Sequence, residues 1–154
     1  IRGLNDGPFD VLLIESDARM SSEDVVTVRA AMRDNNCVMA GSDWNNLLGP
    51  GVNHIRRDNS RWHTNGRIPG VAYIFAGEVE ELRHNPEMRF WYADDWITWS
   101  AQASGGSILV GGTAVEHTGH VTNGGLPEPI ATYAREDLVK FVEHWGGSPH
   151  DGGI

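Results

Sequence analysis

The chain has 154 residues, of which 40% are hydrophobic, and it carries six tryptophans and a formal net charge of −9. This length and composition are typical of one folded domain and argue against a disordered chain. The acidic balance argues against a nucleic-acid partner, because neutralising phosphates requires a basic face. No apolar run reaches the roughly 18 residues that a membrane span requires, so we expect no membrane partner.

We expect a single domain over residues 1–154 that ends in a loose tail at 147–154. No signal peptide is visible, so we expect a soluble protein. The one cysteine is compatible with the cytoplasm, although the sequence does not specify a compartment. Cys37 begins the apolar run CVMAG, which indicates a buried structural thiol rather than a nucleophile.

The beginning of the chain predicts a β-α-β unit. The apolar run PFDVLLIES, residues 8–16, is bounded by turn-forming residues, which favours a buried strand. Ser21 and Asp24 have the spacing of a capping box at the start of a helix over SSEDVVTVRAAMRDNN, where apolar residues recur at helical spacing. The run CVMAGS, residues 37–42, then predicts a second strand.

The middle of the chain predicts a loop followed by strands. Residues 43–70 are rich in Gly, Asn and Pro, which indicates a long loop. Residues 70–83, 88–101 and 107–117 indicate the strands of an antiparallel meander, with ASGGS as the hairpin connector between the last two.

The end of the chain predicts a helix and completes the fold class. Leu138, Phe141, Val142 and Trp145 recur at i, i+3, i+4 and i+7, and Gly146 follows as a stop. We therefore expect an α+β fold, in which the β-α-β unit, the long loop, the meander and this helix pack on a mixed sheet. A wound α/β sheet is the alternative, and it would require helices between residues 70 and 121.

The segment TAVEHTGHVTNGG, residues 113–125, is the first candidate site. His117 and His120 are candidate acid–base residues, with Glu116 as the carboxylate that orients them. If Thr118 and Gly119 form a turn, the two imidazoles converge and would bind a divalent metal as cofactor. A further ligand would come from His54, His63, Asp94 or Asp95. The alternative is a solvated hairpin end.

The segment IRRDNSRWHTNGR, residues 55–67, is the second candidate. Arg56, Arg57 and Arg61 present planar donors that match a carboxylate or phosphate, and Trp62 would stack on a ring. This pattern predicts a clamp for an anionic substrate, and the alternative is a solvated loop whose arginines balance the acidic surface.

Two further segments carry weaker patterns. On a strand through FWYADDWITWS, Tyr92 and Trp96 share one face, which is typical of sugar or flat-ring binding; the alternative is an aromatic core. Ser42 and Asp43 follow the second predicted strand, where ligands bind in open α/β sheets.

These patterns predict a small enzyme that acts on a polar or anionic organic molecule by His/Glu acid–base or metal-assisted chemistry. The reaction would be hydrolysis, elimination or isomerisation, as in a hydrolase or lyase. The three arginines would hold the substrate, while Trp62 and Trp96 would wall the pocket. The alternative is a non-catalytic module, either a carbohydrate-binding domain or a subunit of a larger complex, that uses an aromatic sheet face. A homo-oligomer is compatible with both.

Overall fold

The computed structural model describes residues 9–44, 48–56, 68, 70–82, 85–89, 92–118 and 127–148. The elements, in chain order, are β1 (Asp10–Ile14), β2 (Ala18–Met20), α1 (Ser22–Asp34), β3 (Met39–Ser42), β4 (Gly51–Ile55), β5 (Ala72–Ala76), a 3₁₀ helix (Glu80–Leu82), α2 (Ala93–Ser104), β6 (Ser107–Gly111), β7 (Val115–His117) and α3 (Ile130–Trp145). Within this described part of the chain, no helix is both long and apolar enough to cross a membrane.

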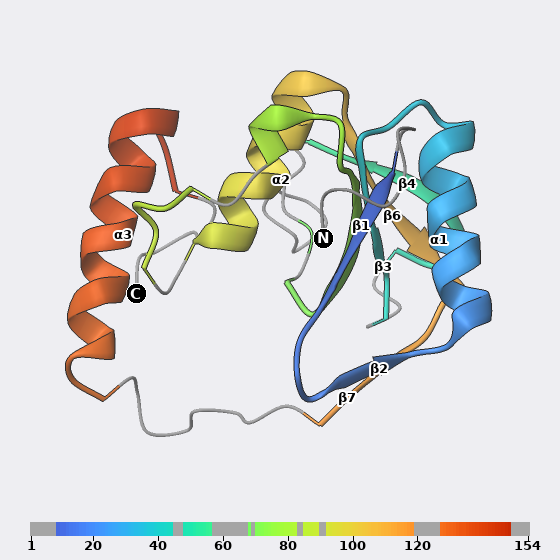
Figure 1. Cartoon of the computed structure of the whole chain (residues 1–154), viewed down its shortest axis with the longest axis horizontal. Helices are drawn as coiled ribbons and strands as arrows, with labels where there is room; N and C mark the ends of the chain where they lie inside the picture. The colour runs from blue at the N-terminus through green and yellow to red at the C-terminus, as the bar shows by residue number, and fades with distance from the viewer. Residues whose placement is uncertain are drawn as a thin grey trace.

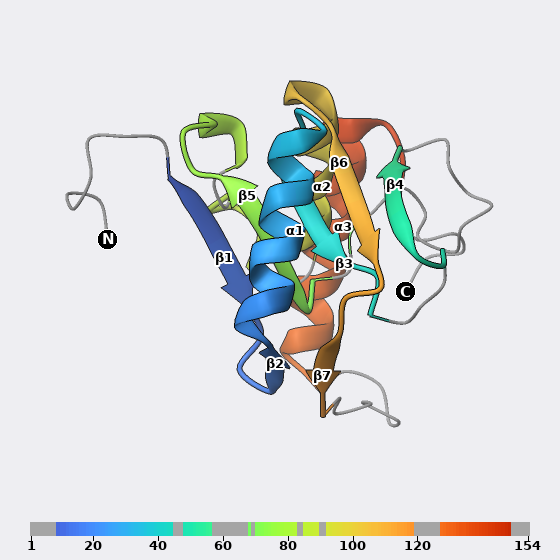
Figure 2. The ribbon, with the colours of Figure 1, turned by 90° about the vertical axis from the view of Figure 1, so that its right-hand side faces the viewer.

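A five-stranded sheet in the order β1-β5-β3-β6-β4 forms the centre of the fold (Figure 2). The strands β3 and β6 pair in parallel, and every other neighbouring pair is antiparallel. A separate two-stranded ribbon joins β2 to β7. The expected α+β class with a mixed sheet is therefore confirmed.

Helix α1 covers one face of the sheet (Figure 2). The expected N-cap is present, because the Ser21 side chain accepts a hydrogen bond of 3.0 Å from the backbone N–H of Asp24. Val28 and Met32 are buried on the inner side of α1, where they pack with Ala40 and other apolar side chains of the sheet. The helix and its apolar face are thus as the sequence predicts.

Helices α2 and α3 form two further layers on the other side of the sheet (Figure 1). Ile97 and Ala101 of α2 pack with Met39 and Leu109 of the sheet. Phe141 of α3 then packs with the aromatic side chains that α2 and its N-terminal flank present. Helix α3 ends at Gly146, in the left-handed conformation with φ of 72°, which confirms the predicted helix and its stop.

The antiparallel meander predicted between residues 70 and 121 is wrong. The segment 88–101 contains the start of helix α2 instead of a strand, and Gly105 follows that helix instead of a hairpin turn. The prediction failed because α2 is covered by the sheet on one side and by α3 on the other, so its sequence is rich in the aromatic and β-branched residues that also favour a buried strand. Helix α2 leads into β6, which pairs in parallel with β3. This part of the chain therefore has a helix where the alternative of a wound α/β sheet required one.

The edges of the sheet also differ from the sequence prediction. Strand β1 is an edge strand whose residues Leu12, Leu13 and Ile14 are partly exposed, so the buried strand expected at 8–16 is wrong in its burial. Strand β4 forms the opposite edge and lies within the predicted loop at 43–70. The tail expected at 147–154 lies outside the described residues beyond Ser148.

The docking of α3 provides a test of this arrangement. Replacing the fully buried Phe141 with alanine should lower the free energy of unfolding by about 3–5 kcal/mol, because it leaves a cavity between α2 and α3. Val139→Ala on the same helix is the matched control, because Val139 is 55% exposed and its loss should cost less than about 0.5 kcal/mol. Urea unfolding followed by tryptophan fluorescence measures both, and equal small losses would contradict the docking.

Candidate functional site

A cluster of one imidazole and two carboxylates lies where β1 ends and the β2–β7 ribbon begins. Glu15 and Asp17 lie in the turn between β1 and β2, and His117 is the last residue of β7. The Nε2 atom of His117 lies 3.1 Å from Oε2 of Glu15 and 3.5 Å from Oδ1 of Asp17. One ligand atom from each of the three residues lies within 4.8 Å of the other two. We call these three residues the histidine–carboxylate cluster.

The backbone holds this cluster from both sides. The N–H of Glu15 donates a hydrogen bond of 3.0 Å to the carbonyl of Val71, the residue directly before β5. This bond connects the turn to β5. The carbonyl of Asp17 accepts from both the N–H and the hydroxyl of Thr118, at 3.1 and 3.0 Å. The ribbon register places Ala18 opposite His117. Two segments about a hundred residues apart therefore hold the three side chains together.

The surroundings of His117 are partly shielded from solvent. The side chain of His117 is 19% exposed, whereas those of Glu15 and Asp17 are 45% and 29% exposed. The indole of Trp44 contacts the imidazole edge-on, with ring centroids 5.6 Å apart. Nε1 of Trp44 is buried and has no hydrogen-bond acceptor among the described residues. The imidazole is thus fixed, while the carboxylates keep freedom to adjust.

The predicted partner Glu116 points elsewhere. Glu116 and His117 are consecutive residues of β7, so their side chains lie on opposite faces of the ribbon, and Glu116 pairs in register with Arg19. The carboxylates beside His117 come from Glu15 and Asp17 instead. His120 and the turn expected at Gly119 lie outside the described residues.

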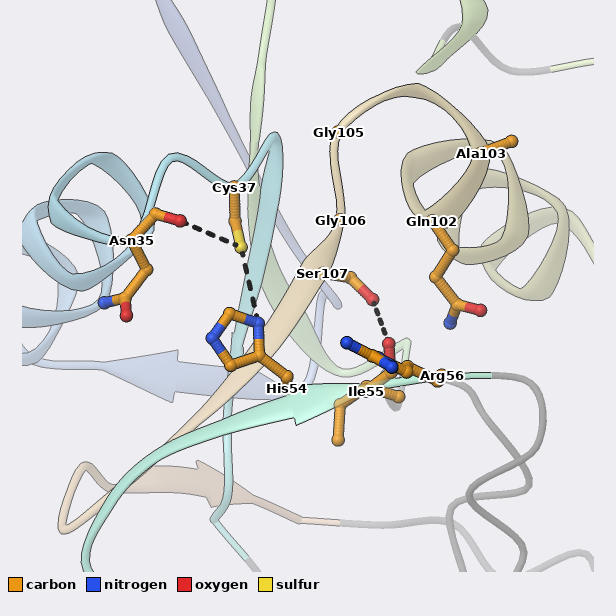
Figure 3. Close-up of a pocket in the computed structure, with 10 residues that line it drawn as sticks. All are labelled: Asn35, Cys37, His54, Ile55, Arg56, Gln102, Ala103, Gly105, Gly106 and Ser107. Carbon is orange, nitrogen blue, oxygen red and sulfur yellow. Dashed lines mark hydrogen bonds between the residues drawn. The ribbon is translucent and has the colours of Figure 1, made fainter.

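The predicted substrate clamp is only partly described. Arg56 lines a separate cleft with Cys37 and His54, where β3 and β6 begin (Figure 3). His117 lies beyond the opposite ends of these strands, and the two ends of β6 alone are about 13 Å apart at roughly 3.3 Å per residue. Arg56 and His117 therefore do not face one small molecule. Arg57, Arg61, Trp62 and His63 lie outside the described part of the chain.

The aromatic pair Tyr92 and Trp96 does not lie on a sheet face. Tyr92 is buried at the start of α2, and Trp96 stacks on His144 of α3 with ring centroids 4.4 Å apart. Asp94 and Asp95 lie in the first turn of α2, a position that suits the helix dipole. The structure therefore places these aromatic side chains between two helices.

Ser42 and Asp43 follow β3 and support the loops there. The Asp43 carboxylate accepts a hydrogen bond of 2.7 Å from the N–H of Leu48. The hydroxyl of Thr113 donates to Ser42 Oγ at 2.8 Å. Both groups are buried, so they hold the segments after β3 and β6 together.

Negative charge is concentrated at the end of the sheet where the histidine–carboxylate cluster lies. The buried phenol of Tyr73 has a pKa raised well above its usual value, first by burial and then by the charges of Asp94, Asp95 and Glu15. These carboxylates and Asp17 favour a cationic ligand at this end of the sheet.

Comparisons with protein-family models, with curated proteins and with solved structures found no match to this chain. The candidate site is therefore identified from its geometry alone.

Sequence reasoning identified His117 but missed both of its carboxylates. Glu15 and Asp17 directly follow the apolar run of β1, and this position at the carboxyl end of a strand was the signal that could have indicated them.

The charge around Tyr73 predicts a loss of stability at alkaline pH. Because its pKa is raised in the folded state, this contribution is present below the unfolded-state pKa of about 10 and is lost as the pH rises above it. The free energy of unfolding should therefore fall more between pH 9 and 11 in the wild type than in Tyr73→Phe. Urea titrations at each pH, compared with pH 7, measure this difference, and parallel curves for the two proteins would contradict it.

Proposed function

We propose that the chain is a small enzyme acting on a polar organic molecule, and that the histidine–carboxylate cluster binds a divalent cation that assists the reaction. The observation that supports this is the convergence of ligand atoms from Glu15, Asp17 and His117 within 4.8 Å. Two ligands bound at about 2.1 Å from one ion lie at most about 4.2 Å apart, so only a small adjustment of the exposed carboxylates is needed.

The types of ligand favour Zn²⁺ or Mn²⁺. One imidazole with two carboxylates is a ligand set that both ions accept, and water or substrate would complete the coordination. The two negative charges of Glu15 and Asp17 would balance the ion, which leaves an almost neutral centre able to accept a substrate oxygen. Such a centre would polarise a carbonyl or activate a water, which would suit hydrolysis, elimination and isomerisation alike.

A metal-free reaction is the second candidate, and the His117 geometry supports it directly. With Nε2 at 3.1 Å from Glu15, the neutral imidazole would donate from Nε2 and keep its Nδ1 lone pair. Nδ1 would then accept a proton from the substrate, while the carboxylates stabilise the imidazolium that forms. Both candidates use the same three residues and differ in whether an ion lies between them.

The substrate is proposed to bind beside Trp44, which walls the imidazole on one side. Arg56 is too far away to hold it, because Arg56 lies at the other end of the sheet. A clamp by Arg57, Arg61 and Trp62 stays a prediction from the sequence.

The metal proposal predicts binding that depends on the cluster. Calorimetric titration of metal-free protein with Zn²⁺ and Mn²⁺ should show one site for at least one of them, weakened 10-fold or more in His117→Ala and in Asp17→Asn. Saturation with 100 times the dissociation constant should stabilise the wild type by about 2.7 kcal/mol. Glu116→Gln is the matched control, because it removes a carboxylate next to His117 that faces away from the cluster.

Absence of binding for both ions, or equal binding by the wild type and His117→Ala, would overturn the metal proposal. The metal-free candidate is tested separately by nitrogen NMR of His117, which should show the proton on Nε2 at neutral pH in the wild type. The combined variant Glu15→Gln with Asp17→Asn should lose that preference, whereas Glu116→Gln should keep it. A proton on Nδ1 in the wild type would contradict this candidate.

A further inference from the structure

A cleft of about 590 Å³ lies at the opposite end of the sheet from the histidine–carboxylate cluster (Figure 3). It is formed where α1 and α2 end and where β3 and β6 begin, with β4 along one side. This volume is within the range of about 300–1,000 Å³ that small-molecule sites occupy. The only cysteine of the chain, Cys37, lies in it.

The chemical groups in the cleft differ from those of the molecule as a whole. None of the ten described residues that line it is acidic, although the chain has 21 acidic residues. Arg56 supplies a full positive charge, and no described carboxylate forms an ion pair with it. His54 and Gln102 extend into the same space from β4 and α2 (Figure 3). The described lining of the cleft therefore carries the positive charge of Arg56 and no acidic side chain, which favours an anion.

Some of the carbonyls at the helix ends beside the cleft are already hydrogen-bonded. The N–H groups of Gly105 and Gly106 both donate to the carbonyl of Ala101 at the end of α2. At the end of α1, the side chain of Asn35 donates to the carbonyl of Ala31 at 2.8 Å. These bonds reduce the number of acceptor groups that face the cleft.

The thiol of Cys37 lies beside the imidazole of His54. Its Sγ atom lies 3.9 Å from Nδ1 of His54 and 3.6 Å from the carbonyl of Asn35 (Figure 3). Cys37 is 5% exposed, which confirms the burial expected from the sequence, and burial raises the pKa of the thiol. A thiol in this setting is a slow nucleophile, so its position serves best as a reporter of what enters the cleft.

We infer that this cleft binds a small organic anion, bearing a carboxylate or a phosphate, through Arg56 and His54, with the Cys37 thiol beside the bound molecule. Arg56 offers the planar donors that match either oxyanion. His54 is fixed by the pairing of β4 with β6, where it lies opposite Ile108. This site is independent of the histidine–carboxylate cluster, because the two lie at opposite ends of the same strands.

The lone cysteine makes the charge preference of the cleft measurable. Iodoacetate and iodoacetamide both alkylate a thiolate, forming a C–S bond as iodide leaves and the thiol proton passes to solvent, but only iodoacetate is an anion. The rate ratio of iodoacetate to iodoacetamide should be higher in the folded protein than in protein unfolded in urea. Arg56→Gln should lower that ratio by up to about five-fold, which is the effect of removing one unit charge from a distance of about 4 Å in a water-like dielectric. Arg19→Gln, which removes the same charge from β2 at the other end of the sheet, should leave it unchanged.

A second measurement tests binding without chemistry at the thiol. Inorganic phosphate and acetate, titrated separately into metal-free protein, should shift the NMR signals of His54 in the wild type and not in Arg56→Gln, and the stronger of the two identifies the preferred oxyanion. An equal alkylation ratio in folded and unfolded protein, or an unchanged ratio in Arg56→Gln, would overturn the inference. If Cys37 reacts with neither reagent, the absence of a His54 shift with both anions would overturn it. The metal-binding experiment above is unaffected by any of these results.

Discussion

The parallel pairing of β3 with β6 is the constraint on which the rest of the structure depends. Parallel neighbours cannot be joined by a hairpin, so each of these strands is entered from a helix, and the two helices cover opposite faces of the sheet. Both helices consequently end at the same end of the sheet, beside the starts of β3 and β6, where the cleft lies. The strands β1, β3 and β6 all run toward the opposite end of the sheet (Figure 2). There the turns and the β2–β7 ribbon bring the histidine–carboxylate cluster together.

The same strand topology places acidic side chains at one end of the sheet and Arg56 at the other. One end of the sheet has Glu15 and Asp17, and the charges of Asp94, Asp95 and Glu15 add to burial in raising the pKa of Tyr73. The other end of the sheet has Arg56, and none of the described residues that line its cleft is acidic. The two ends of β6 are about 13 Å apart, which exceeds the Debye length of about 8 Å at physiological ionic strength, so solvent-exposed charges at one end are largely screened from those at the other. A cation and an anion would therefore bind this chain without competing.

The sequence predicts the elements whose determinants are local. The cap of α1 depends on Ser21 and Asp24, three residues apart, and the end of α3 depends on the conformation of Gly146. The helix α2 was missed because its environment is non-local: Ile97 packs on the sheet and Trp99 packs on α3, so both sides of the helix are apolar. A short segment rich in aromatic and β-branched residues is difficult to distinguish from a buried strand by its sequence alone.

The candidate site shows the same division between local and non-local information. The residue type alone indicated His117, whereas its carboxylates depend on the pairing of β2 with β7 across about a hundred residues of chain. A ribbon of two three-residue strands is marginal by itself, so something beneath it must hold the register. Val71, Ala72 and Val115 are buried together under the ribbon, with Trp44 packed against them. The position of His117 therefore depends on this small apolar cluster, and a chemical role for the imidazole requires that the cluster stay intact.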